Sequence, residues 1–98
     1  MSIRDYRDRG TRDIAAGQPT KFARRVLPVE LHEIAKRRLA FLAAAESLHD
    51  LQARPGLNLH ALIGDRVGQL AIRVNDQFRI CFIWTKTGVA DVEITDYH

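Results

Sequence analysis

The sequence predicts an α+β fold, in which N-terminal helices pack on a twisted antiparallel β-sheet. Apolar residues in the first half recur at the helical period of about 3.6 residues, whereas those in the second half alternate with a period of about 2. A run of helices followed by a run of strands is typical of the α+β class. A chain of 98 residues is long enough for one hydrophobic core, so residues 1–98 are expected to form a single domain.

The helical half is best defined from Pro28 onward, because proline suits the first position of a helix, where no N–H is needed. Arg38 lies near the apolar stripe of this helix, where its stem can pack while its head stays in water. The flanking sequence predicts a short edge strand at 3–6, helices near 8–16 and 20–26, and a closing turn at 47–51. The residues expected on the apolar face of the main helix are Leu31, Ile34, Ala35, Leu42 and Ala45.

Four strands are predicted in the second half, at 57–62, 70–74, 78–84 and 90–94. The breaks between them are short and rich in turn residues, which favours an antiparallel meander. Side chains alternate across a strand, so one face of the sheet should be apolar. The residues expected on that face are Leu57, Leu59, Ala61, Leu70, Ile72, Val74, Phe78, Ile80, Phe82 and Trp84. The opposite, open face should carry Asn58, His60, Arg73 and Arg79.

The positive charge of the chain is unevenly distributed. Residues 1–40 contain ten Lys and Arg against five Asp and Glu, whereas residues 41–98 contain five against seven. A basic helical half favours a polyanionic partner, of which nucleic acid is the most common. A solvated pair of helices explains the charge equally well, so charge alone does not decide between them.

Cys81, the single cysteine, lies in an apolar run and is expected to be buried and inert. One cysteine excludes an intramolecular disulfide and a cysteine-based zinc site, which favours a reducing compartment. The N-terminus lacks the apolar core of a signal peptide, and no stretch approaches the ~20 apolar residues of a membrane span. We therefore expect a cytoplasmic protein with no membrane partner, no metal and no cofactor.

The predicted open face carries residue types that suit RNA cleavage. The reaction removes a proton from a 2′-hydroxyl, stabilises a crowded anionic phosphate and protonates the leaving 5′-oxygen. Histidine transfers protons near neutral pH, which suits His60, and the planar guanidinium of arginine pairs with two phosphate oxygens, which suits Arg73 and Arg79. The alternative is that these are ordinary solvated residues on a one-sided sheet, with Arg79 as a structural ion-pair partner.

A second group follows the last predicted strand, where the chain ends with Thr95, Asp96, Tyr97 and His98. A carboxylate, a phenol and an imidazole together can orient a base, stack on a nucleobase and move a proton. Strict alternation, however, gives Asp96 and His98 the same parity as the core-facing Val92 and Ile94. The strand must twist, bulge or end before Asp96 for these side chains to reach the open face.

The chain resembles the HigB-type killer proteins of the RelE/ParE superfamily of toxins. The resemblance extends over nearly the whole chain and includes Arg7-Asp8, Gly10-Thr11 and Leu27-Pro28. Its most specific motifs are 59–66 (LHALIGDR), 68–69 (GQ), 72–82 (IRVNDQFRICF) and 92–98 (VEITDYH). The resemblance implies a RelE-like fold and ribosome-dependent cleavage of mRNA by metal-independent attack of the RNA 2′-hydroxyl. It also implies a helix-turn-helix antitoxin from the adjacent gene, with operator DNA bound only through the antitoxin complex.

The same resemblance assigns roles to individual residues. It implies that His60 and His98 lie near the scissile phosphate, that Arg73 contacts the phosphate, and that Asp96 and Tyr97 support catalysis. RNA-binding roles are expected for Arg79, Arg66 and Asn58.

One position departs from the family pattern. Many relatives carry a basic residue before the Gly-Asp-Arg turn, where this chain has Ile63. This departure leaves open an attenuated, non-catalytic RNA-binding module as an alternative to an active ribonuclease. A second alternative, which shares the fold but should not need the terminal Asp-Tyr-His, is a ParE-like toxin that acts on a protein target such as DNA gyrase.

Overall fold

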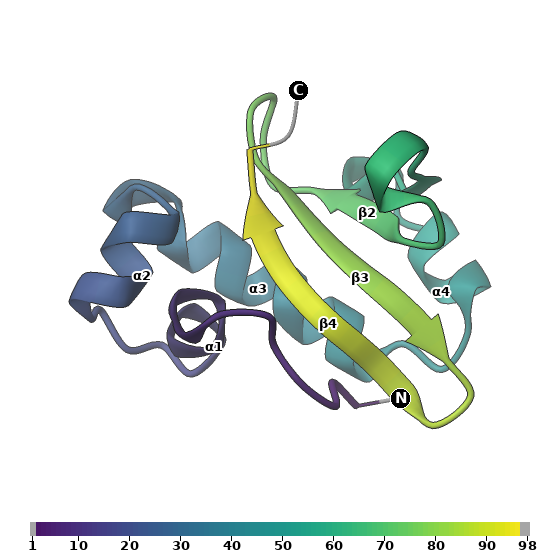
Figure 1. Cartoon of the computed structure of the whole chain (residues 1–98), viewed down its shortest axis with the longest axis horizontal. Coiled ribbons are helices and arrows are strands. Elements are labelled where there is room, and N and C mark those ends of the chain that lie inside the picture. The colour runs from purple at the N-terminus through teal and green to yellow at the C-terminus, as the bar shows by residue number, and fades with distance from the viewer. Residues whose placement is uncertain (1, 97–98) are drawn as a thin grey trace.

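A computed structural model describes residues 2–96, in which helices precede a single antiparallel sheet (Figure 1). The α-helices are α1 (Arg9–Ala15), α2 (Lys21–Val26), α3 (His32–Ala44) and α4 (Leu48–Gln52). Short 3-10 helices are η1 (Val29–Leu31), η2 (Pro55–Leu57) and η3 (Gly64–Arg66). The strands are β1 (His60–Ala61), β2 (Leu70–Arg73), β3 (Arg79–Thr85) and β4 (Gly88–Thr95). The predicted α+β class is confirmed.

The strands form a meander in the order β1-β2-β3-β4, with every neighbouring pair antiparallel. Between Cys81 and Ile83 the pairing with β4 shifts, so that Asp91 and Val92 both lie opposite Phe82. Such a bulge increases the local twist of a sheet. Asp91 has a positive φ of 55°, as an extra residue in a strand often requires.

Side-chain caps define where the short helices begin. The Oδ1 of Asp8 accepts the N–H of Thr11 at 2.7 Å at the start of α1, and the Oγ1 of Thr20 accepts the N–H of Ala23 at 3.1 Å at the start of α2. Ser47 caps α4 through a capping box with Asp50. Each cap satisfies a backbone N–H that has no partner within its own helix. The predicted helices near 8–16 and 20–26 are confirmed, and the predicted closing turn at 47–51 is the short helix α4.

The main helix begins later than predicted. Pro28 has an extended ψ of 142° and precedes η1, so that α3 begins at His32. The apolar face is largely as expected, because Ala35 and Leu42 are buried in α3. Leu39, which the sequence analysis did not place on that face, is also buried.

The predicted edge strand at 3–6 lies beside β4 as two isolated parallel bridges, Ile3 to Val89 and Tyr6 to Val92. It leaves β4 at Asp8, where α1 starts. The N-terminal segment therefore covers the outer edge of β4 only as far as Val92. The last residues of β4 have no backbone neighbour from this segment.

The first predicted strand, at 57–62, is wrong in its extent. Pro55 starts η2, and Asn58 adopts the left-handed conformation with a φ of 48°, so pairing begins only at His60. Ala61, predicted to face inward, is exposed, and the buried residue is Leu62. The strand is short because η2 and the left-handed Asn58 form a turn, whereas the predicted alternation required extended backbone from residue 57.

The main core lies between the helices and one face of the sheet, and it includes Ile14, Leu39, Leu42, Ile72 and Phe82. In Figure 1 the described α-helices lie beside or behind the sheet, so its other face is turned toward the viewer. None of the helices described within residues 2–96 has the length and apolar character that a membrane crossing requires.

Candidate functional site

Strand pairing brings the predicted polar residues to one face of the sheet. His60 pairs with Ala71, Arg73 pairs with Arg79, and Arg79 pairs with Thr95. Cross-strand partners point to the same side of a sheet, and so do residues two apart on one strand. His60, Arg73 and Arg79 therefore share the face opposite the main core, as the alternation predicted.

Arg73 and Arg79 are direct cross-strand neighbours. The Nη2 of Arg73 donates to the carboxylate of Asp76, which lies in the turn between β2 and β3. Arg79 donates through Nη1 to the backbone carbonyls of Asn75 and, at 3.1 Å, of Phe78. Both guanidinium groups are thus held at the turn 75–78.

A third arginine, Arg38 of α3, joins this end of the sheet and was not predicted to do so. Its Nη1 donates to the backbone carbonyls of Gly56, at 2.9 Å, and of Arg73. Burial lowers the pKa of Arg38, and the positive charges of Arg73 and Arg37 lower it further. Sequence periodicity indicated that the stem of Arg38 could pack, but it could not indicate which carbonyls the head would reach.

His60 lies on β1, half-buried, with its ring held by the preceding turn. Its Nδ1 lies 2.9 Å from the backbone carbonyl oxygen of Asn58. A carbonyl oxygen only accepts, so Nδ1 carries the hydrogen, and Nε2 is then the basic nitrogen of the neutral ring. His60 also lines a pocket of about 350 Å³ with Ala61, Leu62, Ile63 and Arg66.

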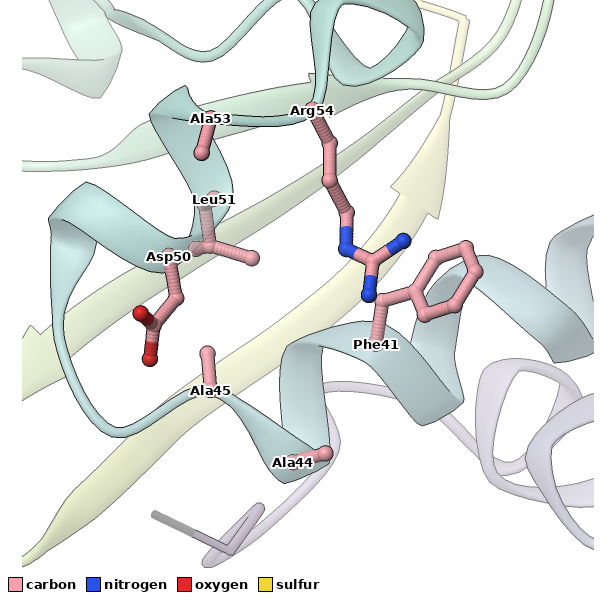
Figure 2. A pocket seen from close by; sticks show the side chains of 7 residues that line it. All are labelled: Phe41, Ala44, Ala45, Asp50, Leu51, Ala53 and Arg54. Atoms are coloured by element: carbon pink, nitrogen blue, oxygen red, sulfur yellow. The ribbon is translucent and has the colours of Figure 1, made fainter.

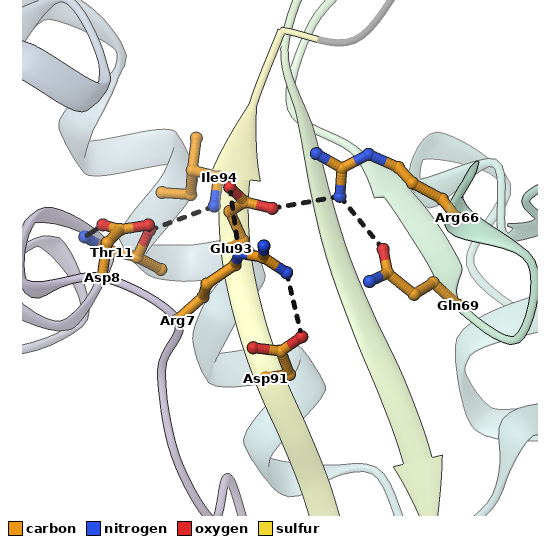
Figure 3. A network of polar contacts seen from close by, with 8 residues as sticks. All are labelled: Arg7, Asp8, Thr11, Arg66, Gln69, Asp91, Glu93 and Ile94. Carbon is orange, nitrogen blue, oxygen red and sulfur yellow. Dashed lines mark hydrogen bonds and ion pairs between the residues drawn. The ribbon is translucent and has the colours of Figure 1, made fainter.

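Arg66 is tied to the far edge of the sheet through Glu93 of β4 (Figure 3). Its Nη1 lies 3.0 Å from Oε1 of Glu93 and donates to Oε1 of Gln69 at 3.1 Å. Glu93 also faces Arg7, whose Nε lies 3.8 Å from Oε2. The carboxylate of Glu93 therefore links the turn that carries Arg66 to the N-terminal segment, and it offsets part of the charge of Arg66.

Strand β4 ends at Thr95, so the alternation of buried and exposed side chains along the strand does not extend to Asp96. Val92 and Ile94 are buried, whereas Asp96 is exposed and lies beyond the strand. The Nε2 of Gln77 donates to Oδ2 of Asp96 at 2.8 Å, so Asp96 meets the same turn that holds both arginines. The predicted residues Tyr97 and His98 lie outside the described residues.

Cys81 is buried, as predicted, with 1% of its surface exposed. It lies two residues after Arg79 and opposite Ala71, so its side chain is on the same side of the sheet as the two arginines. It forms a small cluster with Leu62 and Ala71, separate from the main core. Burial raises the pKa of the Cys81 thiol to about 11, with Glu93 adding to the effect and Arg66 and Arg79 opposing it. A thiol in this state is neutral near pH 7 and is a poor nucleophile.

A larger pocket, of about 460 Å³, lies between α3 and α4 (Figure 2). Arg54 covers Phe41 there, with its guanidinium carbon 3.9 Å from the ring centroid. Of the predicted site residues within 2–96, none lines this pocket, and the Arg54 guanidinium is engaged there in a cation–π contact with Phe41. We therefore place the candidate site on the open face of the sheet rather than in this larger hollow.

A basic α+β chain with helices on one side of a four-stranded antiparallel sheet is consistent with a RelE-like toxin. A family model described as the RelE-like toxin of the type II toxin-antitoxin system HigB matches residues 19–98. The chain therefore belongs to the HigB-like toxins. Residues 1–18 lie outside that match, although the sequence analysis extended the resemblance to them.

A curated relative supports the same family. Toxin HigB-1 of Vibrio cholerae serotype O1 is 36% identical to this chain over 74 residues, which cover 76% of this chain and 77% of the relative. Membership in a type II toxin-antitoxin family implies an antitoxin as partner.

Proposed function

We propose that this toxin is a ribosome-dependent endoribonuclease that cuts mRNA and so inhibits translation. The observation that best supports the proposal is the pairing of Arg73 with Arg79 on an open sheet face. Two cations held opposite each other are suited to bind a phosphate. His60 lies on β1, which pairs with β2, and Asp96 directly follows β4, which pairs with β3.

The proposed reaction needs no group beyond those of the chain and the RNA. A base removes the proton of the 2′-hydroxyl, the 2′-oxygen forms a bond to phosphorus, and the bond from phosphorus to the 5′-oxygen breaks. An acid then protonates the leaving 5′-oxygen, so the products are a 2′,3′-cyclic phosphate and a 5′-hydroxyl. Arg73 would stabilise the charge that develops on the phosphate in the transition state.

Proton transfer is assigned to His60 and His98, because an imidazole ring can accept a proton on one nitrogen and donate a proton from the other. The Nδ1 contact of His60 with the Asn58 carbonyl leaves Nε2 as the basic nitrogen of the ring. Asp96 and Tyr97 are proposed to support this chemistry. Arg79, Arg66 and Asn58 are proposed as RNA contacts, with Arg66 shared between RNA and Glu93.

The partners follow from the same proposal. The ribosome would present the mRNA, and a helix-turn-helix antitoxin from the adjacent gene would neutralise the toxin and carry the complex to operator DNA. The basic helical half offers an acidic partner a steering surface. Cytoplasmic action is part of the proposal, because translating ribosomes are its substrate.

The direct test is cleavage of a defined mRNA, with and without translating ribosomes, by purified protein. We expect cuts only on ribosomes, and their loss in Arg73→Ala but not in Arg25→Ala, which removes an exposed arginine from α2. A DNA gyrase supercoiling assay serves as the parallel measurement. Inhibition of gyrase without any RNA cleavage would show that the ParE-like alternative is correct.

A further inference from the structure

Thr11 of α1 is fully buried although it is polar, with 0% of its surface exposed. Its hydroxyl makes two hydrogen bonds, which Figure 3 shows. It donates to Oδ2 of Asp8 at 3.1 Å and accepts the backbone N–H of Ile94 at 3.1 Å. The second bond joins the first helix to the end of the last strand, 83 residues away in the sequence.

The position of this bond follows from how the N-terminal segment leaves the sheet. Backbone bonds cover the outer edge of β4 up to Val92, whose N–H donates to the Asp5 carbonyl at 3.3 Å and whose carbonyl accepts from Arg7 at 2.9 Å. The chain then turns into α1 at Asp8. The N–H of Ile94 points to the same edge, and the side chain of Thr11 takes the place of the missing backbone acceptor.

The inner side of the strand end is held as well. Thr95 pairs with Arg79, and Asp96 accepts a hydrogen bond from Gln77 at 2.8 Å. The last described residues of the chain are thus held between Thr11 on one edge of β4 and the turn 75–78 on the other.

We propose that Thr11 is a positioning residue, whose buried hydroxyl fixes the end of β4 and thereby sets Asp96 at the turn 75–78 beside the arginine pair. The inference rests on the proposed function, because it assigns catalytic meaning to the end of the chain. Thr11 itself touches neither arginine and would act only through the backbone at Ile94.

The test uses Thr11→Val, which keeps the shape of the side chain and removes both hydrogen bonds, and Thr11→Ser, which keeps the hydroxyl. Thr20→Val is the matched control, since the Thr20 hydroxyl also makes two hydrogen bonds, to Asp13 at 2.6 Å and from Ala23 at 3.1 Å, but none to β4. We expect Thr11→Val to lower kcat for ribosome-dependent cleavage by about 10-fold or more, because small misplacements of catalytic groups carry large rate penalties. KM for ribosomes should stay unchanged, Thr11→Ser should restore kcat, and Thr20→Val should keep it.

Gln77→Leu is a second variant, which removes the hydrogen bond from Gln77 to Asp96 and changes an exposed side chain. It should lower kcat in the same direction, and it keeps the inference testable if Thr11→Val folds poorly. Amide hydrogen exchange provides a readout independent of cleavage. Exchange at Ile94 should rise in Thr11→Val and stay at the wild-type rate in Thr20→Val.

A wild-type kcat in folded Thr11→Val, or an equal loss in Thr20→Val, would overturn the inference. If the wild-type protein cleaves no RNA, the proposed function is wrong, and the proposed effect of Thr11 on catalysis is wrong with it. Hydrogen exchange at Ile94 would then still report whether Thr11 holds the strand end, so the two failures are distinguishable.

Discussion

Arg73 of β2 and Arg79 of β3 lie directly opposite each other on the open face of the sheet. Like charges at such positions destabilise a sheet, by roughly 0.2–1 kcal/mol per pair. The only ion pair that the described residues provide for them is between Arg73 and Asp76, whose side chain is 98% exposed. A phosphate bound by these two side chains would offset that repulsion, which is the role that we propose for the pair.

Arg73→Ala should abolish growth inhibition and leave the fold intact. Loss of a donor to the charged transition state typically lowers kcat by about 10²–10³-fold. The free energy of unfolding should stay unchanged or rise, because the substitution removes a like-charge contact with Arg79. Growth assays and denaturant unfolding of the purified variant measure the two effects.

Arg25→Ala is the matched control for lost positive charge, because Arg25 is exposed on α2. It should leave toxicity unchanged. A folded Arg73→Ala protein with full toxicity would show that Arg73 has no part in catalysis.

His98→Ala should cripple RNA cleavage with little change in stability. The imidazole is assigned to proton transfer, and residues beyond the last strand generally contribute little to packing. Cleavage on translating ribosomes and the melting temperature should be compared with those of His49→Ala, which replaces an exposed histidine of α4. Cleavage at the wild-type rate by His98→Ala would leave His60 as the leading candidate for proton transfer.

Ile63→Lys should raise cleavage activity or leave it unchanged. Ile63 is 88% exposed beside the pocket that His60 lines, so a lysine there adds a cation without disturbing the core. The salt dependence of RNA binding should become steeper by about one phosphate contact. Val67→Lys, at a position that is 77% exposed in the same turn, tests whether any added charge has this effect. A folded but less active Ile63→Lys protein would mean that the apolar side chain itself contributes to binding.

Cys81 should resist alkylation in the folded protein at pH 8. The thiol is buried and its pKa is raised to about 11, so almost none of it is the reactive thiolate. The raised pKa also means that this group contributes fully to stability below its ordinary pKa of 9.0, and that the contribution is lost as the pH rises through about 11. Alkylation rates with and without denaturant measure this protection. Fast alkylation of the native protein would show that the cluster of Leu62, Ala71 and Cys81 is accessible to solvent.

The sequence was sufficient to place Arg73 and Arg79 on one face, because β2 and β3 form a regular ladder from Leu70 to Arg73. Alternation is reliable where pairing is regular. It failed at the first strand, where the left-handed Asn58 and the turn before it leave only two residues to pair.

The contacts that shape the site could not be predicted, because their partners are distant in sequence. The acceptor for the Ile94 N–H lies in α1, and the carbonyls that hold Arg38 lie in η2 and β2. Alternation also left open how β4 ends near Asp96, and in the structure the strand ends at Thr95 and Asp96 accepts a hydrogen bond from Gln77. Such endings depend on tertiary packing, which a periodic pattern does not contain.

Mapping the 5′ ends of cellular mRNA after brief expression of this protein shows directly whether the toxin cuts translated messages. We expect new 5′-hydroxyl ends within translated reading frames for the wild-type protein, and none for Arg73→Ala expressed at the same level. Growth arrest without new mRNA ends, or the same ends in cells that express Arg73→Ala, would contradict this expectation.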